Sequence, residues 1–390
     1  MLIEGRLVED GRAVRVETDG PRIARIQEVD PAAAPMPWIS PGLIDIQVNG
    51  FGGHDANAPD VTPTTIAELV RSLWSRGVTA LCPTVITAPE EAILRALQAI
   101  DAACSGDPLI GHSIPSIHVE GPFISPEDGP RGAHPREHVR PPDYLEVQRW
   151  QNAARGRLGI ITVAPELPRA CDLIEHATAD GLLLSIGHTA ASPEHVRAAA
   201  DAGARLSTHL GNGAHAVLPR HPNYIWEQLA EDRLTAGLIF DGHHLPAAVM
   251  KTMLRAKTLE RVVLVSDSSA VGGLPPGVYE TPVGGRVELR ADNLLTLYGS
   301  LFLAGAASPL PCGVANAVRL AGLTLAEAVR VSSTNPARLL GLDREGRGVV
   351  RVGASADLTV FRFTPGDPDL SVELTLIAGE RVYAAESGGE

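Results

Sequence analysis

The chain has 390 residues, of which 44 % are hydrophobic and 20 % charged, as is usual for a folded globular protein. Its formal net charge of −13 argues against nucleic-acid binding, because a polyanion is attracted to basic surfaces. The sequence holds no run of about twenty uncharged apolar residues, so we expect no membrane-spanning helix.

The cysteines and the first residues bear on where the protein works. Cys82, Cys104, Cys171 and Cys312 form no CxxC pair. The opening residues, MLIEGRLVEDGR, lack the basic-then-apolar layout of a secretory signal. We therefore expect a reduced, cytoplasmic protein.

Both ends of the chain consist of short β-type runs separated by Gly, Asp and Pro. They read LIEGRLVED, AVRVETD and RIARIQEV near the start, and GVVRVG, DLTVFRF and LTLIAGERVYA near the end. This pattern predicts one small β-sandwich domain built from residues 1–40 and 348–390, which the middle of the chain interrupts.

Between these segments, residues 41–347 alternate apolar β-type runs with helical patterns. Many of the helical stretches begin with Ser, Thr or Pro, as caps and first turns do. Eight such units predict an α/β fold, a (β/α)8 TIM barrel that forms the catalytic domain. The expected strands cover residues 42–50, 78–87, 113–121, 158–166, 181–189, 204–212, 234–242 and 261–269.

The stretch that follows the eighth strand is longer than one unit. Residues 277–306 suggest hairpins before helical patterns resume. Loops after barrel strands commonly shape the substrate pocket. Leu303, Ala304 and Gly305 are therefore expected to line it.

Four residues able to bind metal or move protons lie where predicted strands end: Glu120, His188, His209 and Asp267. The carboxyl ends of barrel strands carry the active site in this fold. Imidazole nitrogen and carboxylate oxygen suit Zn²⁺ or Fe²⁺, and three protein ligands leave a position open for chemistry. The pattern predicts Glu120, His188 and His209 as ligands and Asp267 as a general base.

Each of these residues also has a structural explanation. A single His at a strand end is more often hydrogen bonded than a ligand. His118 shares a strand face with Glu120 and is a spare ligand candidate. Asp267 could cap the turn that SDSS permits. Only the joint placement of the four favours a metal site.

Several motifs resemble the N-acetylglucosamine-6-phosphate deacetylases, a family of the amidohydrolase superfamily. The resemblance spans nearly the whole chain, and HVEGPF followed by GAHP is its most specific part. The other shared segments are PGLIDIQVNGFGG, IGHTAAS, STHLGN, DGHHLP, VSDSSAVGG, LAGAASPL and ADLTVF.

This resemblance implies that Glu120, His188 and His209 bind the metal and that Asp267 is the general acid/base. Many amidohydrolases have His-x-His after the first strand and bind two metals, whereas this chain has Gln47 and Asn49 there. Neutral amides are poor ligands for a second ion. The expectation is one divalent ion per subunit, best matched by Zn²⁺, with Fe²⁺ as the alternative.

The resemblance also implies substrate contacts. His134 is expected to assist catalysis as well, by donating to the developing oxyanion. The family's phosphate-binding Arg comes from the neighbouring subunit, so a homodimer is expected, with Arg220 crossing the interface. The expected substrate-binding residues are Ala133, His134, Asn212, Gly213, Arg220 and His244.

The expected reaction is hydrolysis of N-acetylglucosamine 6-phosphate to acetate and glucosamine 6-phosphate. The family usually has an aromatic residue and then Asn-Ala-Met after the sixth strand, where this chain has Gly211-Asn212-Gly213-Ala214. N-acetylgalactosamine 6-phosphate or another N-acyl amino sugar is therefore an alternative. Another amidohydrolase reaction and a non-catalytic binding protein are further alternatives. Either His243 or His244 could reach the substrate.

Overall fold

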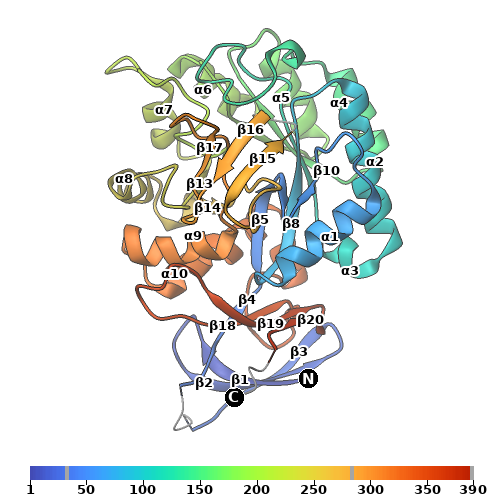
Figure 1. Ribbon diagram of the computed structural model, residues 1–390, viewed down its shortest axis with the longest axis vertical. Coiled ribbons are helices and arrows are strands. Elements are labelled where there is room, and N and C mark those ends of the chain that lie inside the picture. The colour runs from blue at the N-terminus through green and yellow to red at the C-terminus, as the bar shows by residue number, and fades with distance from the viewer. Residues whose placement is uncertain (31–34, 282–284, 387–390) are drawn as a thin grey trace.

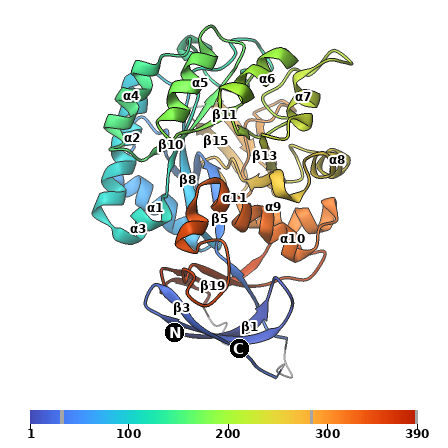
Figure 2. The same cartoon turned by 180° about the vertical axis from the view of Figure 1, so that it is seen from behind.

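The computed structural model describes residues 1–30, 35–281 and 285–386. Eight parallel strands follow one another around one sheet in the order β14-β13-β12-β11-β10-β9-β8-β5. Its edges meet where Val48 forms a parallel bridge to Ser268 and the Asp267 N–H donates to Gln47 O at 2.9 Å. The sheet thus closes into a barrel with helices outside, as Figure 1 and Figure 2 show. The expected (β/α)8 fold is confirmed.

The barrel strands lie within the eight predicted runs. Every residue of the first, third and eighth strands is buried, because helices cover the outside and side chains fill the inside. This explains why the runs are continuously apolar rather than alternating. The strands are β5 (Leu43–Val48), β8 (Val78–Ile86), β9 (Ile117–Glu120), β10 (Leu158–Val163), β11 (Leu183–Ile186), β12 (Leu206–Ser207), β13 (Thr235–Ile239) and β14 (Val262–Val265).

Several helices begin at capping residues that the sequence suggests. Thr62 Oγ1 accepts the Thr65 N–H at 3.1 Å before α1, and Ser192 Oγ accepts the His195 N–H before α6. Among the described residues, none of the helices combines the length and apolar character needed to cross a membrane. The helices are α1 (Pro63–Trp74), α2 (Glu90–Gly106), α3 (Pro108–Ser113), α4 (Tyr144–Ala153), α5 (Ala170–Ala179), α6 (Pro193–Ala202), α7 (Tyr224–Ala230), α8 (Ala247–Lys257), α9 (Leu310–Asn316), α10 (Leu325–Val329) and α11 (Asn335–Leu339).

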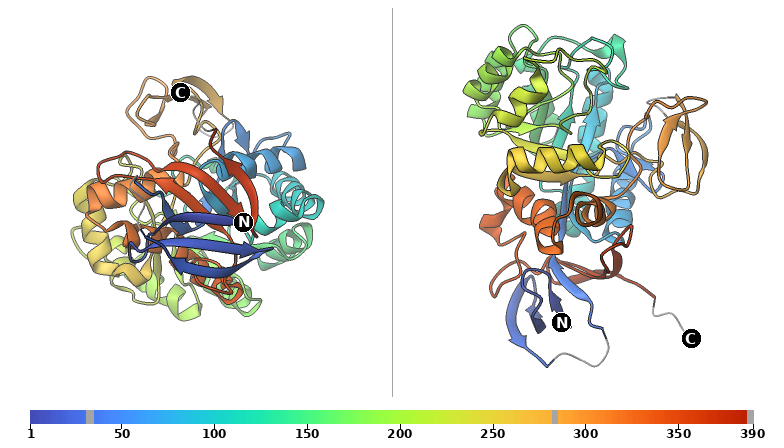
Figure 3. Two further views of the ribbon diagram at one scale, coloured as in Figure 1. Left: turned by 90° about the horizontal axis from the view of Figure 1, so that it is seen from below. Right: turned by 90° about the vertical axis from the view of Figure 1, so that its left-hand side faces the viewer.

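Strands from both ends of the chain pair in one further sheet, of order β20-β19-β18-β4-β1-β2-β3. The strands from the two ends lie side by side in Figure 3, left. They share a core that includes Val14, Ile39 and Leu358. The limits 1–40 and 348–390 stay predictions, and residues 31–34 and 387–390 lie outside the described ranges. The strands are β1 (Leu2–Leu7), β2 (Ala13–Asp19), β3 (Arg22–Glu28), β4 (Trp38–Pro41), β18 (Leu358–Arg362), β19 (Ser371–Ile377) and β20 (Glu380–Ala384).

The segment after the eighth strand forms a small antiparallel sheet, hereafter the insert. It consists of β15 (Gly277–Thr281), β16 (Gly285–Leu289) and β17 (Leu295–Leu297). Val287, Leu289 and Leu295 are buried in a core of its own with Val271. The insert projects to one side of the barrel (Figure 3, right).

A buried ion pair joins the terminal sheet to the barrel. Arg347 Nε lies 2.9 Å from Asp357 Oδ2, and both side chains are 3 % exposed. His112, in α3, places its Nε2 2.9 Å from the same oxygen. Burial alone would raise the pKa of Asp357, but the hydrogen bond with His112 and the charge of Arg347 lower it below its usual range.

Replacing Asp357 tests this junction. We expect Asp357→Asn to lower the free energy of unfolding at pH 7 by about 3 kcal/mol, because Arg347 stays buried without its counter-ion. The lowered pKa means that folding favours the ionised carboxylate. Its contribution is complete above the unfolded pKa of about 3.9 and is lost as pH falls through the folded pKa. Urea denaturation should therefore show the difference from wild type shrinking as the pH falls below the unfolded pKa of about 3.9.

The control is Glu373→Gln, which breaks the exposed pair with Arg362. Such a pair contributes less than about 1 kcal/mol. Equal losses in the two variants would contradict the role given to the buried pair.

Candidate active site

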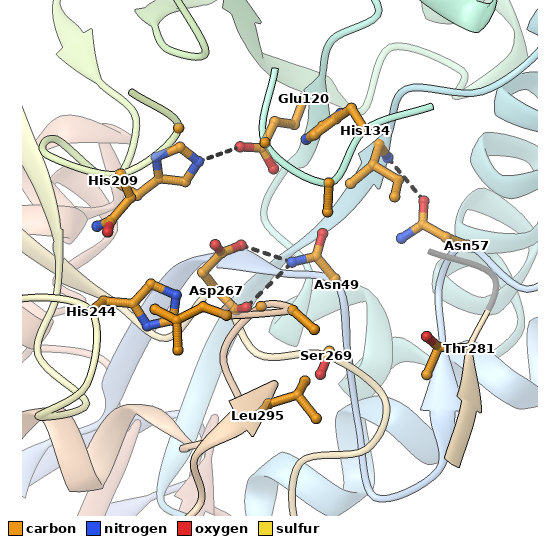
Figure 4. A pocket seen from close by; sticks show the side chains of 18 of the residues that line it. Asn49, Asn57, Glu120, His134, His209, His244, Asp267, Ser269, Thr281 and Leu295 are labelled. Carbon is orange, nitrogen blue, oxygen red and sulfur yellow. Dashed lines mark hydrogen bonds and ion pairs between the residues drawn. The ribbon is translucent and has the colours of Figure 1, made fainter. Parts of the chain in front are cut away.

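A pocket of about 290 Å³ opens at the carboxyl ends of the barrel strands, beside the insert. Glu120, His209 and Asp267 line it from the barrel, while Leu295 and Leu303 line it from the insert side. Figure 4 shows these barrel residues converging from different strands. The pocket therefore lies where this fold keeps its chemistry.

Three of the predicted residues meet at one point. Glu120 ends β9, and His188 and His209 follow β11 and β12 by two residues each. His188 Nε2 and His209 Nε2 lie 3.1 Å and 2.9 Å from Glu120 Oε1, and 3.0 Å from each other. Barrel closure thus brings together residues separated by up to 89 positions.

The backbone at this site departs from relaxed geometry. His188, His209 and Asp267 have φ values of 51°, 28° and 51°, in the left-handed region. A non-glycine residue held there costs about 1–3 kcal/mol, so such positions persist where the surrounding structure imposes them. Each of the three lies two residues after the end of a barrel strand. Strain concentrated at three of the four candidate residues supports a functional assignment.

The proton positions favour a cation between the three side chains. His188 Nδ1 lies 2.9 Å from Pro130 O and can only donate to it, so the Nε2 of neutral His188 carries a lone pair. Burial would raise the pKa of Glu120, but His188 and His209 lower it well below its usual range. Burial would likewise lower the pKa of His209, yet Glu120 raises it to about 9. The ionised Glu120 carboxylate therefore favours a positive charge in the buried space between Glu120, His188 and His209.

The donor set fits a divalent metal ion. In tetrahedral zinc sites with bonds near 2.05 Å, ligand atoms lie about 3.3 Å apart, close to the spacing seen here. Two imidazoles and a carboxylate are typical ligands of a catalytic zinc. Glu120 and His188 can also be grouped with His134, with donor atoms within 4.8 Å of one another. We favour His209 as the third ligand, since its nitrogen approaches both other atoms more closely.

Asp267 lies beside this cluster, held by two amides. Gln47 Nε2 lies 3.0 Å from Asp267 Oδ1 and also 3.0 Å from Glu120 Oε1. Asn49 Nδ2 donates to the same Asp267 oxygen at 2.8 Å. Burial and the charge of Glu120 raise the pKa of Asp267 to about 6, in the range suited to a group that takes and returns a proton. Its Oδ2 remains available for that transfer.

Two further histidines differ in position. His134 lines the pocket, its Nδ1 lies 2.7 Å from Thr87 Oγ1, and burial with the charge of His188 lowers its pKa to about 3. Neutral His134 can therefore donate to a substrate oxygen only from the tautomer protonated at Nε2. His118 does not line the pocket, and its Nε2 lies 2.8 Å from Thr162 Oγ1. This placement gives no support to His118 as a spare ligand.

Most of the expected substrate contacts also line the pocket. They are Ala133, His134, Asn212, Gly213, His244, Leu303, Ala304 and Gly305. His243 turns away from the pocket, with its Nε2 2.8 Å from Asp292 O in the insert. Of the two adjacent histidines, His244 is therefore the one that lines the pocket. Arg220 is exposed and does not line the pocket of its own chain.

Sequence reasoning missed several lining residues. Asp55, Asn57 and Ile86 come from the hairpin after the first strand and from the end of the second. The polar HDAN segment directly after a glycine turn was the available signal for the first two. Gly132, Ser269, Ala270, Thr281 and Leu295 complete the unforeseen lining.

A closed parallel barrel with this donor set beside a partly buried carboxylate defines a metal-dependent hydrolase. The model of the amidohydrolase family matches residues 38–382. The chain therefore belongs to the amidohydrolase family, and within it to the N-acetylglucosamine-6-phosphate deacetylases, as the following relatives show. Hydrolases of this superfamily depend on metal.

The human N-acetylglucosamine-6-phosphate deacetylase is 36 % identical over 369 residues, which cover 90 % of this chain and 84 % of that protein. An N-acetylgalactosamine-6-phosphate deacetylase of Escherichia coli O157:H7 is 35 % identical over 309 residues, 78 % of each chain. A Mycobacterium smegmatis N-acetyl-D-glucosamine-6-phosphate deacetylase, solved as an aspartate-to-alanine mutant with N-acetyl-D-glucosamine-6-phosphate, is 29 % identical. Its TM-score is 0.86, over 98 % of this chain and 99 % of that one.

The donor set predicts a measurable metal content. We expect the wild-type protein to retain about one equivalent of divalent metal after dialysis, and Glu120→Gln to weaken binding by more than about 100-fold, because the anionic ligand is lost. Elemental analysis measures both. His118→Gln is the matched control and should keep its metal. Two tightly held equivalents in the wild type would contradict a one-metal site.

Proposed function

We propose that this protein hydrolyses N-acetylglucosamine 6-phosphate to acetate and glucosamine 6-phosphate. The observation that carries the proposal is the convergence of Glu120, His188 and His209 beside Asp267, in a chain 36 % identical to a deacetylase of that substrate. The four cysteines are unpaired, which supports a cytoplasmic location.

Glu120, His188 and His209 would hold one divalent ion, with Zn²⁺ as the best match and Fe²⁺ as the alternative. Such an ion would supply Lewis acidity that polarises the acetyl carbonyl and acidifies water. Gln47 and Asn49 direct their amide N–H groups at carboxylates, so they serve here as donors rather than as ligands of a second ion.

Asp267 and His134 have different roles in the proposed reaction. Asp267 Oδ2 takes a proton from the attacking water, and later gives it to the nitrogen, so that an amine leaves instead of an amide anion. His134, if protonated at Nε2, donates a hydrogen bond to the carbonyl oxygen as negative charge develops there. The two amides keep Asp267 Oδ1 occupied, which reserves Oδ2 for the reaction.

The phosphate explains why a second subunit would be needed. Among the residues that the structure describes, no lysine or arginine lines the pocket. Of the two residues expected at the phosphate, Arg220 and His244, only His244 lines the pocket. Arg220 is exposed, in the loop between β12 and α7. We propose a homodimer in which Arg220 crosses to the partner's phosphate site.

The sugar has a second candidate. The chain is 35 % identical to the E. coli N-acetylgalactosamine-6-phosphate deacetylase, nearly the value found for the human enzyme. Asn212 and Gly213 line the pocket in a loop where the family usually has bulkier residues, which could admit the epimeric hydroxyl. An intact donor set and the Asp267 position argue against a non-catalytic binding protein.

A substrate panel tests the phosphate site. We expect acetate release from N-acetylglucosamine 6-phosphate to exceed release from the unphosphorylated sugar. We expect Arg220→Ala to lower kcat/KM for the phosphorylated substrate by about 10- to 100-fold, because a charge-assisted contact is lost. The plain sugar should be unaffected. Comparing acetate release from N-acetylgalactosamine 6-phosphate shows which of the two epimers the protein prefers. Equal wild-type rates on the phosphorylated and the unphosphorylated sugar would contradict the role given to Arg220.

Asp267→Asn tests the proton carrier. The amide keeps the shape of the side chain but cannot take a proton, so kcat should fall by about 1,000-fold. Metal content measured on the same sample should stay near the wild-type value, since Asp267 is not in the proposed ligand set. Near-normal turnover by a metal-loaded Asp267→Asn protein would show that another residue moves the proton.

A further inference from the structure

The Asn49 side chain lies beside Asp267 in the wall of the pocket. Its Nδ2 lies 2.8 Å from Asp267 Oδ1 and 3.4 Å from Asp267 O. Both of these atoms are acceptors, which fixes the amide with its nitrogen on Asp267 and its oxygen turned away. In Figure 4 that oxygen points toward the side of the pocket where His134 lies.

The other end of this amide has no partner. Asn49 Oδ1 is buried and accepts no hydrogen bond from the described residues, although Asn49 lines the pocket. An unpaired buried acceptor costs about 1–3 kcal/mol, so native structures seldom leave one unsatisfied. Less than 1 Å² of the Oδ1 surface is accessible, but the Asn49 side chain lines the pocket, so a small shift of this side chain would bring Oδ1 to a donor on the molecule that fills the pocket.

An N-acetyl sugar offers one donor at the reacting centre, the amide N–H. Nitrogen is also the atom to which Asp267 must return its proton. We propose that Asn49 Oδ1 accepts the N–H of the scissile amide while Asn49 Nδ2 holds Asp267, so that one side chain aligns the proton carrier with the leaving nitrogen. This inference rests on the proposed deacetylation.

The proton count of the reaction is consistent with this role. Water loses one proton to Asp267 Oδ2 as its oxygen bonds to the carbonyl carbon. The C–N bond then breaks, and the nitrogen keeps the electron pair and takes the proton from Oδ2. The hydrogen bonded to Asn49 stays on nitrogen, so the product is a primary amine beside acetic acid, which ionises to acetate.

Gln47 provides a matched comparison. It also donates to Asp267 Oδ1, at 3.0 Å, but its side chain is fully buried and does not line the pocket. Gln47 is thus a positioning residue for Asp267, whereas Asn49 both positions Asp267 and contacts substrate. A substrate without the N–H separates the two roles.

The experiment compares N-acetylglucosamine 6-phosphate with the ester that has oxygen in place of the nitrogen at C2. We expect Asn49→Ala to lower kcat/KM for the amide by about 100-fold and for the ester by about 10-fold, because only the amide loses a hydrogen bond to Asn49. Since an alkoxide leaves more easily than an amide anion, weakened proton donation alone could also spare the ester. Gln47→Ala measures that effect. For each variant, the amide-to-ester loss ratio is the fold-loss of kcat/KM on the amide divided by the fold-loss on the ester. This ratio should be at least about threefold smaller for Gln47→Ala than for Asn49→Ala.

Binding supplies a measurement that does not need turnover. Calorimetry on the metal-free proteins should show Asn49→Ala binding the amide about 5-fold more weakly than wild type, with the ester unchanged. Gln47→Ala should bind both like wild type. Asn49→Ser, whose hydroxyl can accept a hydrogen bond, should recover part of the amide-specific loss, and it replaces Asn49→Ala if that variant does not fold.

Equal amide-to-ester loss ratios for the Asn49 and Gln47 variants would overturn the proposed contact while leaving the deacetylation intact. Loss of amide and ester affinity together in Asn49→Ala would also overturn it. A metal-loaded wild-type protein that hydrolyses neither compound would instead refute the proposed function, and the inference with it.

Discussion

The buried carboxylate of Glu120 is the constraint on which the site depends. At the carboxyl end of β9 it is removed from water, yet two imidazole nitrogens approach one of its oxygens within 3.1 Å. A buried ion without a counter-charge is costly, so this arrangement requires a cation. His188 and His209 have a strained, left-handed backbone, and this conformation places both imidazole rings beside the Glu120 carboxylate.

The same constraint explains the neighbouring amides. Asp267 is a second carboxylate close to Glu120 and is partly buried, and two like charges oppose each other in a medium of low polarity. Gln47 Nε2 bonds both carboxylates, and Asn49 adds a second donor to Asp267. Neutral donors reduce the repulsion without bringing in another ion. Both amides bond Oδ1 of Asp267, so among the described residues they leave Oδ2 without a hydrogen-bond donor.

The sequence predicted the barrel well, because parallel strands buried on both faces leave continuous apolar runs. It placed Glu120, His188, His209 and Asp267 at strand ends, where closure brings them together. It could not predict His243 bonding the insert, nor Asp55 and Asn57 in the pocket wall, since those positions depend on loop paths without periodic patterning. Even β12 is only two residues long, so His209 was found from its apolar run rather than from strand length.

Charge balance favours one divalent ion over two, in addition to ligand preference. Glu120 and Asp267 can carry two negative charges, and His188 and His209 would add none as neutral metal ligands, so one divalent cation would make the cluster neutral. A second divalent ion would leave two uncompensated positive charges in a pocket with no other described carboxylate except Asp55. In the proposed reaction a proton moves from water to Asp267, and the negative charge lost there would reappear on the substrate oxygen. The buried cluster then keeps its net charge through the reaction, which avoids the cost of creating charge away from solvent.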